Sequence, residues 1–267
     1  MTVASFIPEI WSAALLEPYN AGQIVIPTLT REYEGTATRG NVVHVNALGQ
    51  INVQDYKAAG RTFNPEDLTT VGMPIPIDQE KVTAYRIDNV DRRQAAGSLD
   101  AATIAAGEAL AEDAENYAVG MLKSGGKQVT VTAPTDYASA HTVLAKLRTA
   151  LGRKVPLAGR YAVVSPEFAE LLLGADSALV KVNEAGSENE LRNGVIGRLL
   201  GFTILEHPAL TDTEAIGYHG RAAAFISQID ESRAVPAQNA HADIVSHLLV
   251  YGAKVTRKDG VVVAKAG

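Results

Sequence analysis

The chain has 267 residues, of which 46% are hydrophobic and 20% are charged, and its formal net charge at pH 7 is −6. A chain of this length is close to the size at which one hydrophobic core stops growing and chains divide into domains. The absence of cysteine excludes disulfides, cysteine-ligated zinc, iron–sulfur clusters and thiol catalysis. The negative charge argues against tight nucleic-acid binding over a broad surface, because such binding needs many cationic contacts to phosphates.

Residues 1–39 are predicted to form an arm rather than a domain. The sequence FIPEIWSAALLEPY has a helix cap at Ser5 and apolar side chains on one face, and Pro18 ends the pattern near Glu17. The stretch lacks the basic, apolar and small-residue order of a signal peptide, and the chain has no apolar run of about 18 residues. We therefore expect synthesis inside the cell, no membrane-spanning helix, and an amphipathic arm that packs on another surface.

Residues 40–90 are predicted to form one long hairpin. The outgoing strand alternates apolar and polar side chains in NVVHVNALGQINVQDY, and the return strand does the same in LTTVGMPIPIDQEKVTAYRID. Pro74 and Pro76 remove ladder donors from one side of the return strand, which only an edge strand tolerates. A two-stranded ribbon is marginally stable in water unless another surface covers it. The ribbon is thus expected to lie either across the subunit's own body or on a neighbouring chain.

The stretch Ser98–Gly126 is predicted to be one helix about 40 Å long. Ser98 is a suitable N-cap, and Gly125 with Gly126 is expected to supply a left-handed stop. Its apolar residues fall on one stripe, and the acidic side is interpreted as a solvated or partner-facing surface. The apolar stripe comprises Leu99, Ala102, Ala106, Ala109, Leu110, Tyr117, Met121 and Leu122, and the acidic side carries Glu108, Glu112, Asp113, Glu115 and Asn116.

The region after the long helix mixes helices and strands without a regular repeat. Strands are predicted at 128–132, 202–206 and 222–229, and a short helix or turn is expected just before residue 202. One helix is predicted after a cap at Asp136 or Thr135, with a stripe of Ala140, Val143, Leu144, Leu147 and Leu151. Another is predicted after Ser165, with Pro166 at the first helical position. This mixture favours an α+β fold over a doubly wound one.

The last predicted feature is a turn near the C-terminus. Lys258-Asp259-Gly260 lies between two runs of β-branched residues and is expected to close a β-hairpin.

The sequence contains no complete catalytic, cofactor or metal motif. The stretch that begins at Gly120 nearly matches a phosphate loop, but Gly126 occupies the position of the lysine. Asp212 begins a partial calcium loop, in which Ile216 and Ala223 cannot supply oxygen ligands. There is no nucleophile elbow, no HExxH motif and no dinucleotide fingerprint. We therefore predict no catalytic, cofactor-binding or metal-binding residue, and a protein that is not an enzyme.

The order of these elements resembles the major capsid proteins of tailed double-stranded DNA bacteriophages, which have the Hong Kong 97-type fold. Three stretches carry the resemblance: FIPEIWSAALLE at the start, IPIDQEKVTAYRIDNVDRRQA leading into the long helix, and NGVIGRLLGFTILEHPAL followed by VYGAKVTRKDGVVV. The resemblance covers nearly the whole chain, and the order of the stretches is more specific than any single one.

The resemblance implies an α+β Hong Kong 97-type capsid fold in five parts. These are an N-terminal arm at 1–39, an extended loop at 40–90, a peripheral domain with a spine helix at 91–155, an axial domain at 156–244, and strands at 245–267 that return to the peripheral domain. It further implies a structural protein whose hexamers and pentamers form an icosahedral head around double-stranded DNA. The expected location is the virion capsid, after assembly in the cytoplasm of the bacterial host.

The partners implied by the resemblance are other copies of the chain, portal and decoration proteins, and packaged DNA through weak non-specific contacts, with no membrane. The arm motif begins at Phe6, which leaves no room for a built-in scaffolding segment. A separate scaffolding protein, or none, is therefore expected. Two alternatives remain open at this point: the shell protein of an encapsulin nanocompartment, which resembles the same fold, and a soluble α+β enzyme without a recognisable motif.

Overall fold

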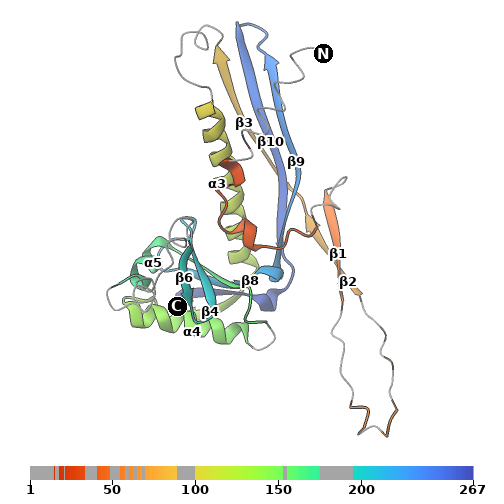
Figure 1. Ribbon diagram of the computed structural model, residues 1–267, viewed down its shortest axis with the longest axis vertical. Coiled ribbons are helices and arrows are strands. Elements are labelled where there is room, and N and C mark those ends of the chain that lie inside the picture. Colours follow the sequence, from red (N-terminus) through yellow and green to blue (C-terminus); the bar gives the residue numbers. More distant parts are fainter. Residues whose placement is uncertain are drawn as a thin grey trace.

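The structure is a computed structural model, and it describes residues 15, 18–20, 22–33, 41–48, 55–57, 60–62, 65, 67, 70–88, 100–152, 155–174 and 195–266. Most of the helix predicted from Ser5 to Glu17, and the predicted N-cap Ser98, lie outside the described residues. The described strands form three sheets, and one long helix runs along the longest axis of the molecule (Figure 1). No helix in these ranges has the length and apolar character needed to span a membrane.

An elongated three-stranded antiparallel sheet lies beside the long helix (Figure 1). The central strand β10 (Ala242–Val255) pairs with β3 (Gln79–Asp88) on one side and with β9 (Ala223–Pro236) on the other. Because side chains alternate along a strand, one face of β10 turns its apolar side chains toward the helix. Val245, Leu249, Tyr251 and Ala253 are buried on that face.

The long helix α3 (Asp100–Gly125) has 26 residues and packs mainly against β10. The predicted apolar stripe is confirmed at Ala106, Leu110 and Leu122, which are buried, but it is wrong at Ala109, which is exposed. The buried strip passes instead through Ala111, Ala114, Ala118 and Val119. Small side chains therefore line the contact, which lets the helix approach the sheet closely.

The end of α3 differs from the prediction. Neither Gly125 nor Gly126 has a positive φ, so the expected left-handed stop is wrong. A Cβ at Gly125 would lie 2.6 Å from Val255 Cγ2, and a Cβ at Gly126 would lie 2.8 Å from Val263 Cγ2. Glycine is needed at these positions because the chain passes directly against two strands, and strand β4 (Lys127–Val131) begins at the next residue.

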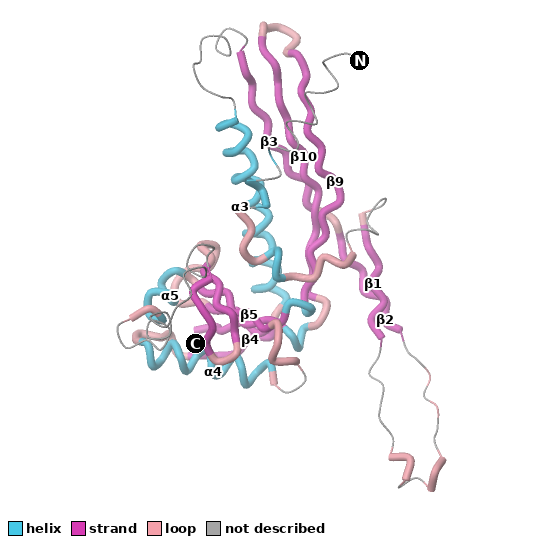
Figure 2. Tube along the Cα trace, in the orientation of Figure 1, coloured by secondary structure: helices cyan, strands magenta, loops and turns pink. Residues whose placement is uncertain are grey.

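A six-stranded mixed sheet with the order β4-β11-β8-β5-β7-β6 forms the second part of the molecule (Figure 2). Helices α4 (Tyr137–Leu151) and α5 (Pro166–Leu172) cover one of its faces. The other face packs toward α3 and the N-terminal segment. The remaining strands are β5 (Arg160–Val164), β6 (Val195–Leu199), β7 (Phe202–Glu206), β8 (Ala215–His219) and β11 (Val261–Ala266).

The two shorter helices confirm their predicted caps. The carboxylate of Asp136 accepts the N–H of Ser139 at 2.9 Å, and Ser139 Oγ accepts the N–H of Asp136 at 3.1 Å, which completes a reciprocal capping pair. Ser165 Oγ accepts the N–H of Phe168 at 3.2 Å, with Pro166 at the first helical position. The predicted stripe of α4 is buried at every position: Ala140, Val143, Leu144, Leu147 and Leu151.

One prediction for the last third of the chain is wrong. Lys258–Gly260 is a 3-10 turn, and it does not close a hairpin: the strand before it, β10, belongs to the three-stranded sheet, and the strand after it, β11, pairs with β4 and β8. Their partners are distant in sequence, and the local pattern does not identify them. The helix or turn expected just before residue 202 is confirmed as a turn at residues 200 and 201, which joins strand β6 to its antiparallel partner β7.

The sheets group the chain differently from the predicted ranges. The predicted boundary between residues 155 and 156 separates β4 and α4 from β5, although β4 and β5 share the six-stranded sheet. Strand β9, which falls in the predicted axial range 156–244, belongs to the three-stranded sheet beside α3. The last strand, β11, lies in the six-stranded sheet and not in the sheet beside α3.

The ribbon is a separate two-stranded antiparallel sheet of β1 (Val42–Leu48) and β2 (Thr70–Pro76). The hairpin prediction is therefore confirmed over these strands but wrong for residues 79–88, which pair with β10. At the base of the ribbon, Ile75 is fully buried in a cluster with Ile77, Ala224, Ile226 and Val250, and Val43 and Val45 pack against this cluster. The base thus lies across the subunit's own sheet.

Candidate assembly surfaces

The described residues at the tip of the ribbon, 55–57 and 60–62, lie away from the body of the molecule (Figure 1). They are exposed, and Tyr56 is 54% exposed. The tip is nonetheless an ordered turn: the N–H of Arg61 donates to Tyr56 O at 2.8 Å, and both Gly60 and Arg61 have positive φ. A turn that is held away from the body is well placed to contact another molecule.

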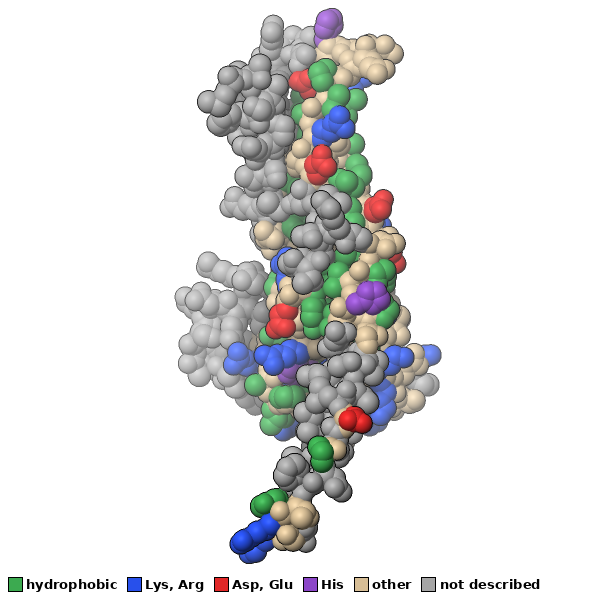
Figure 3. Space-filling model, turned by 90° about the vertical axis from the view of Figure 1, so that its right-hand side faces the viewer, with side chains coloured by type: hydrophobic (Ala, Val, Ile, Leu, Met, Phe, Trp, Pro, Cys, Tyr) green, Lys and Arg blue, Asp and Glu red, His purple; other side chains and the backbone are tan. Residues whose placement is uncertain are grey.

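The three-stranded sheet has a second face, opposite α3, that carries exposed apolar side chains. Val82 is 59% exposed, and Ile244 and Val235 are each 40% exposed. Ile244 and Val235 are directly opposite each other in the β9–β10 register, and Val82 is opposite Leu248. On the side of the molecule seen in Figure 3, hydrophobic side chains run along much of the long axis. Exposed apolar side chains gathered on one face are typical of interaction sites.

A buried carboxylate fastens the N-terminal segment to α3. Glu115 is 1% exposed, although the sequence placed it on the solvated acidic side of the helix, and that assignment is wrong. Its Oε1 accepts the N–H groups of Ile24 and Ile26 at 3.0 and 2.9 Å, and its Oε2 accepts the N–H of Val25 at 2.9 Å. The carboxylate therefore satisfies three consecutive backbone donors that would otherwise be buried without partners.

His207 lies beside this carboxylate. Its Nδ1 accepts the N–H of Ala209 at 3.1 Å, so the neutral ring carries its proton on Nε2, which is 3.6 Å from Glu115 Oε2. Burial lowers the pKa of His207, and the charge of Glu112 partly opposes that change. Burial raises the pKa of Glu115, and the hydrogen bonds from the N–H groups of residues 24–26 oppose this increase. The ring thus stays neutral near pH 7, and the backbone donors provide most of the stabilisation of the carboxylate.

Close contacts hold the rest of this segment in place. A Cβ at Gly22 would lie 3.0 Å from Ala111 Cβ, so the segment packs closely against α3 here. Farther along, the N–H of Thr30 donates to Ala223 O at 3.1 Å, and the N–H of Phe225 donates to Thr30 O at 3.1 Å. The segment therefore links α3 to strand β9 and fixes the direction in which the chain leaves toward the ribbon.

The expectation of no catalytic, cofactor-binding or metal-binding residue stays a prediction. Within the ranges that the structure describes, no three His, Asp or Glu side chains come close enough to hold a metal ion. His247 is fully buried, and Ser232 Oγ lies 2.8 Å from its Nδ1. Burial lowers the pKa of this histidine, so it is a neutral core residue at pH 7.

The model of the phage capsid protein family matches residues 67–264. The chain belongs to this family. The capsid protein is also similar to a solved structure from Mycobacterium phage Che8, at 39% sequence identity over 91% of each chain and with a TM-score of 0.76. No curated protein sequence matches it. A structural role in a phage capsid is therefore its function, and other copies of the chain are its partners in an oligomeric shell.

More distant structures show the same fold. The capsid structure of cyanophage P-SCSP1u is 14% identical, with a TM-score of 0.66 over 86% of this chain and 84% of that one. The virus-like particle from Pyrococcus furiosus is also 14% identical, with a TM-score of 0.66 over 97% of this chain and 99% of that one. The capsid protein thus has the Hong Kong 97-type α+β fold that the order of its elements predicts.

Proposed function

We propose that copies of this capsid protein form the hexamers and pentamers of an icosahedral head that encloses double-stranded DNA. The observation that carries the proposal is the ribbon, whose base is buried on its own subunit while its described tip residues are exposed. A ribbon of two strands needs cover, and a neighbouring subunit in a ring would supply it. The apolar second face of the three-stranded sheet supports the same arrangement, because it extends beyond the area that the ribbon base covers.

The elements suggest how the chain is divided between the parts of such a subunit. The ribbon, with residues 42–48 and 70–76 as its strands, would be the extended loop, and residues 1–39 would be the N-terminal arm. Helix α3 with its three-stranded sheet would be the spine helix and peripheral domain. The six-stranded sheet with α4 and α5 would be the axial domain. These assignments follow the sheets, and the contiguous ranges expected from the sequence stay a prediction.

The remaining expectations belong to the same proposal. The protein would have no enzymatic activity, would assemble in the cytoplasm of the bacterial host, and would meet packaged DNA only through weak contacts. A net charge of −6 supports the last point, because a container must hold DNA without binding it tightly. A separate scaffolding protein, a portal and decoration proteins would be its other partners. An encapsulin-type shell remains the second candidate, favoured by the fold shared with the Pyrococcus furiosus particle.

Assembly of the purified protein tests the proposal. We expect the protein expressed alone to give capsomers, closed shells or irregular polymers, because repeated head-to-tail contacts either close into rings or continue. Light scattering at physiological salt and electron microscopy would detect these species. A stable monomer at tens of micromolar protein would contradict it. Closed shells that carry a protein cargo instead of DNA, when isolated from the native source, would favour the encapsulin candidate.

A further inference from the structure

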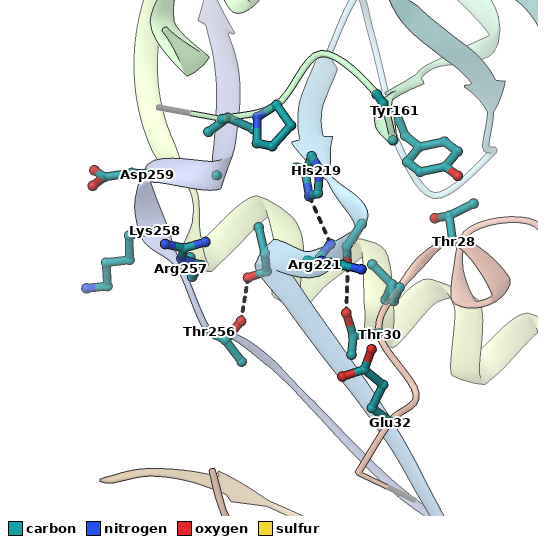
Figure 4. Close-up of a pocket in the computed structure, with 18 of the residues that line it drawn as sticks. Thr28, Thr30, Glu32, Tyr161, His219, Arg221, Thr256, Arg257, Lys258 and Asp259 are labelled. Carbon is teal, nitrogen blue, oxygen red and sulfur yellow. Dashed lines mark hydrogen bonds between the residues drawn. The ribbon is translucent and has the colours of Figure 1, made fainter. Parts of the chain in front are cut away.

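A pocket of about 1030 Å³ lies where the two main sheets meet (Figure 4). Its walls come from four separate parts of the chain, namely residues 28–32, 155–161, 219–222 and 256–260. A cavity of this size is at the upper end of the range that takes a ligand of several linked groups. The pocket lies apart from the ribbon, the apolar second face of the sheet and the Glu115 anchor described above.

The walls of the pocket are fixed by contacts within the subunit. Arg160, which is 3% exposed, donates to Pro156 O and Gly152 O at 2.9 Å each and to Val155 O at 2.6 Å, and so holds one wall. On the opposite side, a Cβ at Gly220 would lie 2.5 Å from Thr28 O, so two segments touch through their backbones. The pocket therefore exists before any ligand enters it.

Four cationic side chains line the pocket, namely Arg31, Arg221, Arg257 and Lys258, and they come from three of its segments. Arg221, Arg257 and Lys258 are exposed, and none of them forms an ion pair with a carboxylate in the part of the chain that the structure describes. Glu32 and Asp259 are the carboxylates in the lining, and neither is within ion-pair distance of those last three cations. The pocket thus presents positive charge that the subunit itself does not neutralise.

The positive charge is strong enough to act on a neighbouring group. Burial lowers the pKa of His219, and the charges of Arg221, Arg160 and Arg257 lower it further, against the hydrogen bond with the backbone of Ala158. The ring is also engaged, because its Nδ1 accepts the N–H of Arg221 at 3.1 Å. His219 is therefore neutral near pH 7 and adds no charge of its own.

The three threonine hydroxyl groups in the pocket already donate hydrogen bonds within the subunit. Thr28 Oγ1 donates to Val25 O at 2.6 Å, Thr30 Oγ1 to Gly220 O at 3.2 Å, and Thr256 Oγ1 to Ala222 O at 3.0 Å. Recognition of a ligand therefore depends on the cations and on the shape of the pocket. Arg and Lys bind carboxylates and phosphates, so the ligand must carry an anionic group.

The surroundings favour a carboxylate-bearing polypeptide over nucleic acid. A DNA duplex presents a dense row of phosphates on a convex surface, which cannot enter a pocket, and Glu32 and Asp259 would repel it. A polypeptide segment can place single carboxylates next to Arg221 and Arg257, and its uncharged residues can lie beside Glu32 and Asp259. The chain itself has a surplus of such carboxylates, since it contains 30 Asp and Glu against 24 Lys and Arg.

We propose that the pocket binds an acidic segment of a second copy of this chain and so forms an inter-subunit contact of the shell. The proposal rests on the assembly proposed above, which places other copies next to this surface. Charge pairs across an interface affect specificity and rate of association, and they fix how the partners align. The pocket would therefore determine which neighbouring copy is accepted and in what orientation.

Charge reversal in the pocket tests this inference. We expect the double variant Arg221→Glu/Arg257→Glu to melt at the temperature of the parent subunit, because both side chains are exposed, but to lower shell yield by about tenfold or more. The matched control is Lys146→Glu/Arg148→Glu, which reverses the same number of charges on the exposed side of α4 and should keep shell yield within about twofold of the parent. Yields are compared by sizing and electron microscopy.

Each other outcome has a defined meaning. Normal assembly of the pocket variant would overturn the inference, and so would an equal loss with Lys146→Glu/Arg148→Glu, because the effect would then be one of total charge. Pocket variants that form normal shells but retain less DNA would overturn it in favour of a phosphate ligand. A parent protein that does not assemble would refute the proposed assembly itself and is distinguishable from all of these.

A second measurement decides the matter if the double variant fails to fold. A carbodiimide couples the amine of Lys258 directly to a carboxylate that is in contact with it. In shells assembled from a mixture of light- and heavy-isotope subunits, a coupled pair of peptides that contains both isotopes identifies a bond between chains. We expect Lys258 of one chain to couple to an Asp or Glu of another chain in assembled parent shells. Coupling only within its own chain, to Glu32 or Asp259, would overturn the inference.

Discussion

The six-stranded sheet and the β1–β2 ribbon are both made of strands, but they differ in what covers them. Both faces of the six-stranded sheet are buried within the subunit, one under α4 and α5 and the other toward α3. Among the described residues of the ribbon, Ile75 at the base is buried and the tip residues are exposed. The first region therefore contributes to the subunit's own stability, whereas the ribbon tip is the part that we propose to contact other molecules. Substitutions should therefore separate folding from assembly.

The largest effect is expected from the anchor between α3 and the N-terminal segment. Glu115→Ala should lower the free energy of unfolding by about 3–5 kcal/mol, because it leaves three buried N–H donors without an acceptor. Urea unfolding of the free subunit measures the change. Glu115→Gln keeps one carbonyl acceptor and should lose less. A loss below about 1 kcal/mol for the alanine variant would mean that water replaces the carboxylate.

The next effect concerns the buried side of α3. Leu110 is 4% exposed, so Leu110→Ala should cost about 2–5 kcal/mol. Glu112 is exposed on the other side, and Glu112→Ala should change the free energy of unfolding by less than about 0.5 kcal/mol. Equal destabilisation by both substitutions would show that the helix is rotated relative to the faces described here.

Close packing at the end of α3 gives a smaller effect. Gly125→Ala should destabilise the subunit by about 1–3 kcal/mol, because the new Cβ would lie 2.6 Å from Val255 Cγ2. Thermal unfolding detects this change. The double variant Gly125→Ala/Val255→Ala removes the opposing methyl groups and should recover part of the loss. Gly120→Ala is the control, since a Cβ there meets nothing within 4 Å.

Stability should also fall on mild acidification. Burial lowers the pKa values of His207 and His247 from the usual 6.5, so the unfolded chain takes up their protons first as the pH falls. Their contribution to stability is present above pH 6.5 and is lost below it, by up to about 1 kcal/mol per pH unit for each ring. Glu115 has a raised pKa and acts in the opposite direction at lower pH, toward 4.5. Replacement of His207 by Gln should flatten the pH dependence of the free energy of unfolding between pH 7 and 5.5.

The smallest effect on the stability of the subunit is expected at the ribbon tip. This change is also the sharpest test of the difference between the six-stranded sheet and the ribbon. Replacing Lys57–Asp67 by a short turn should leave the melting temperature of the free subunit nearly unchanged, because the described residues of this segment are exposed. Shell formation should fail, because each subunit loses the part that reaches its neighbour. Thermal melts and electron microscopy measure the two results.

The base of the ribbon provides the control for this experiment. Ile75→Ala should destabilise the free subunit by about 2–5 kcal/mol, because Ile75 is fully buried against β9 and β10. A shortened ribbon that still gives normal closed shells would contradict the proposed role of the tip. A shortened ribbon that unfolds the subunit would show that the tip is also part of its own core.

The sequence by itself determined the helices and strands that depend on residues close together in the chain. The cap at Asp136 and the stripe of α4 were predicted, because capping and helical periodicity depend on residues three or four positions apart. The length of α3 and the two strands at the base of the ribbon followed from periodicity in the same way. The order of these elements was enough to indicate the capsid fold.

Only the tertiary structure decided which distant segments meet. The sequence pattern places Glu115 on the polar side of α3. The residue is buried because its carboxylate accepts backbone donors about 90 positions earlier in the chain. The turn at Lys258–Gly260 has the composition of a hairpin, yet its two strands join different sheets because their partners lie far away in sequence. Gly125 and Gly126 resemble a helix stop, but the space available beside Val255 and Val263 explains them. The spacing of residues along the chain fixes which side chains share one face of a helix or strand. Which other part of the protein packs against that face depends on the whole fold.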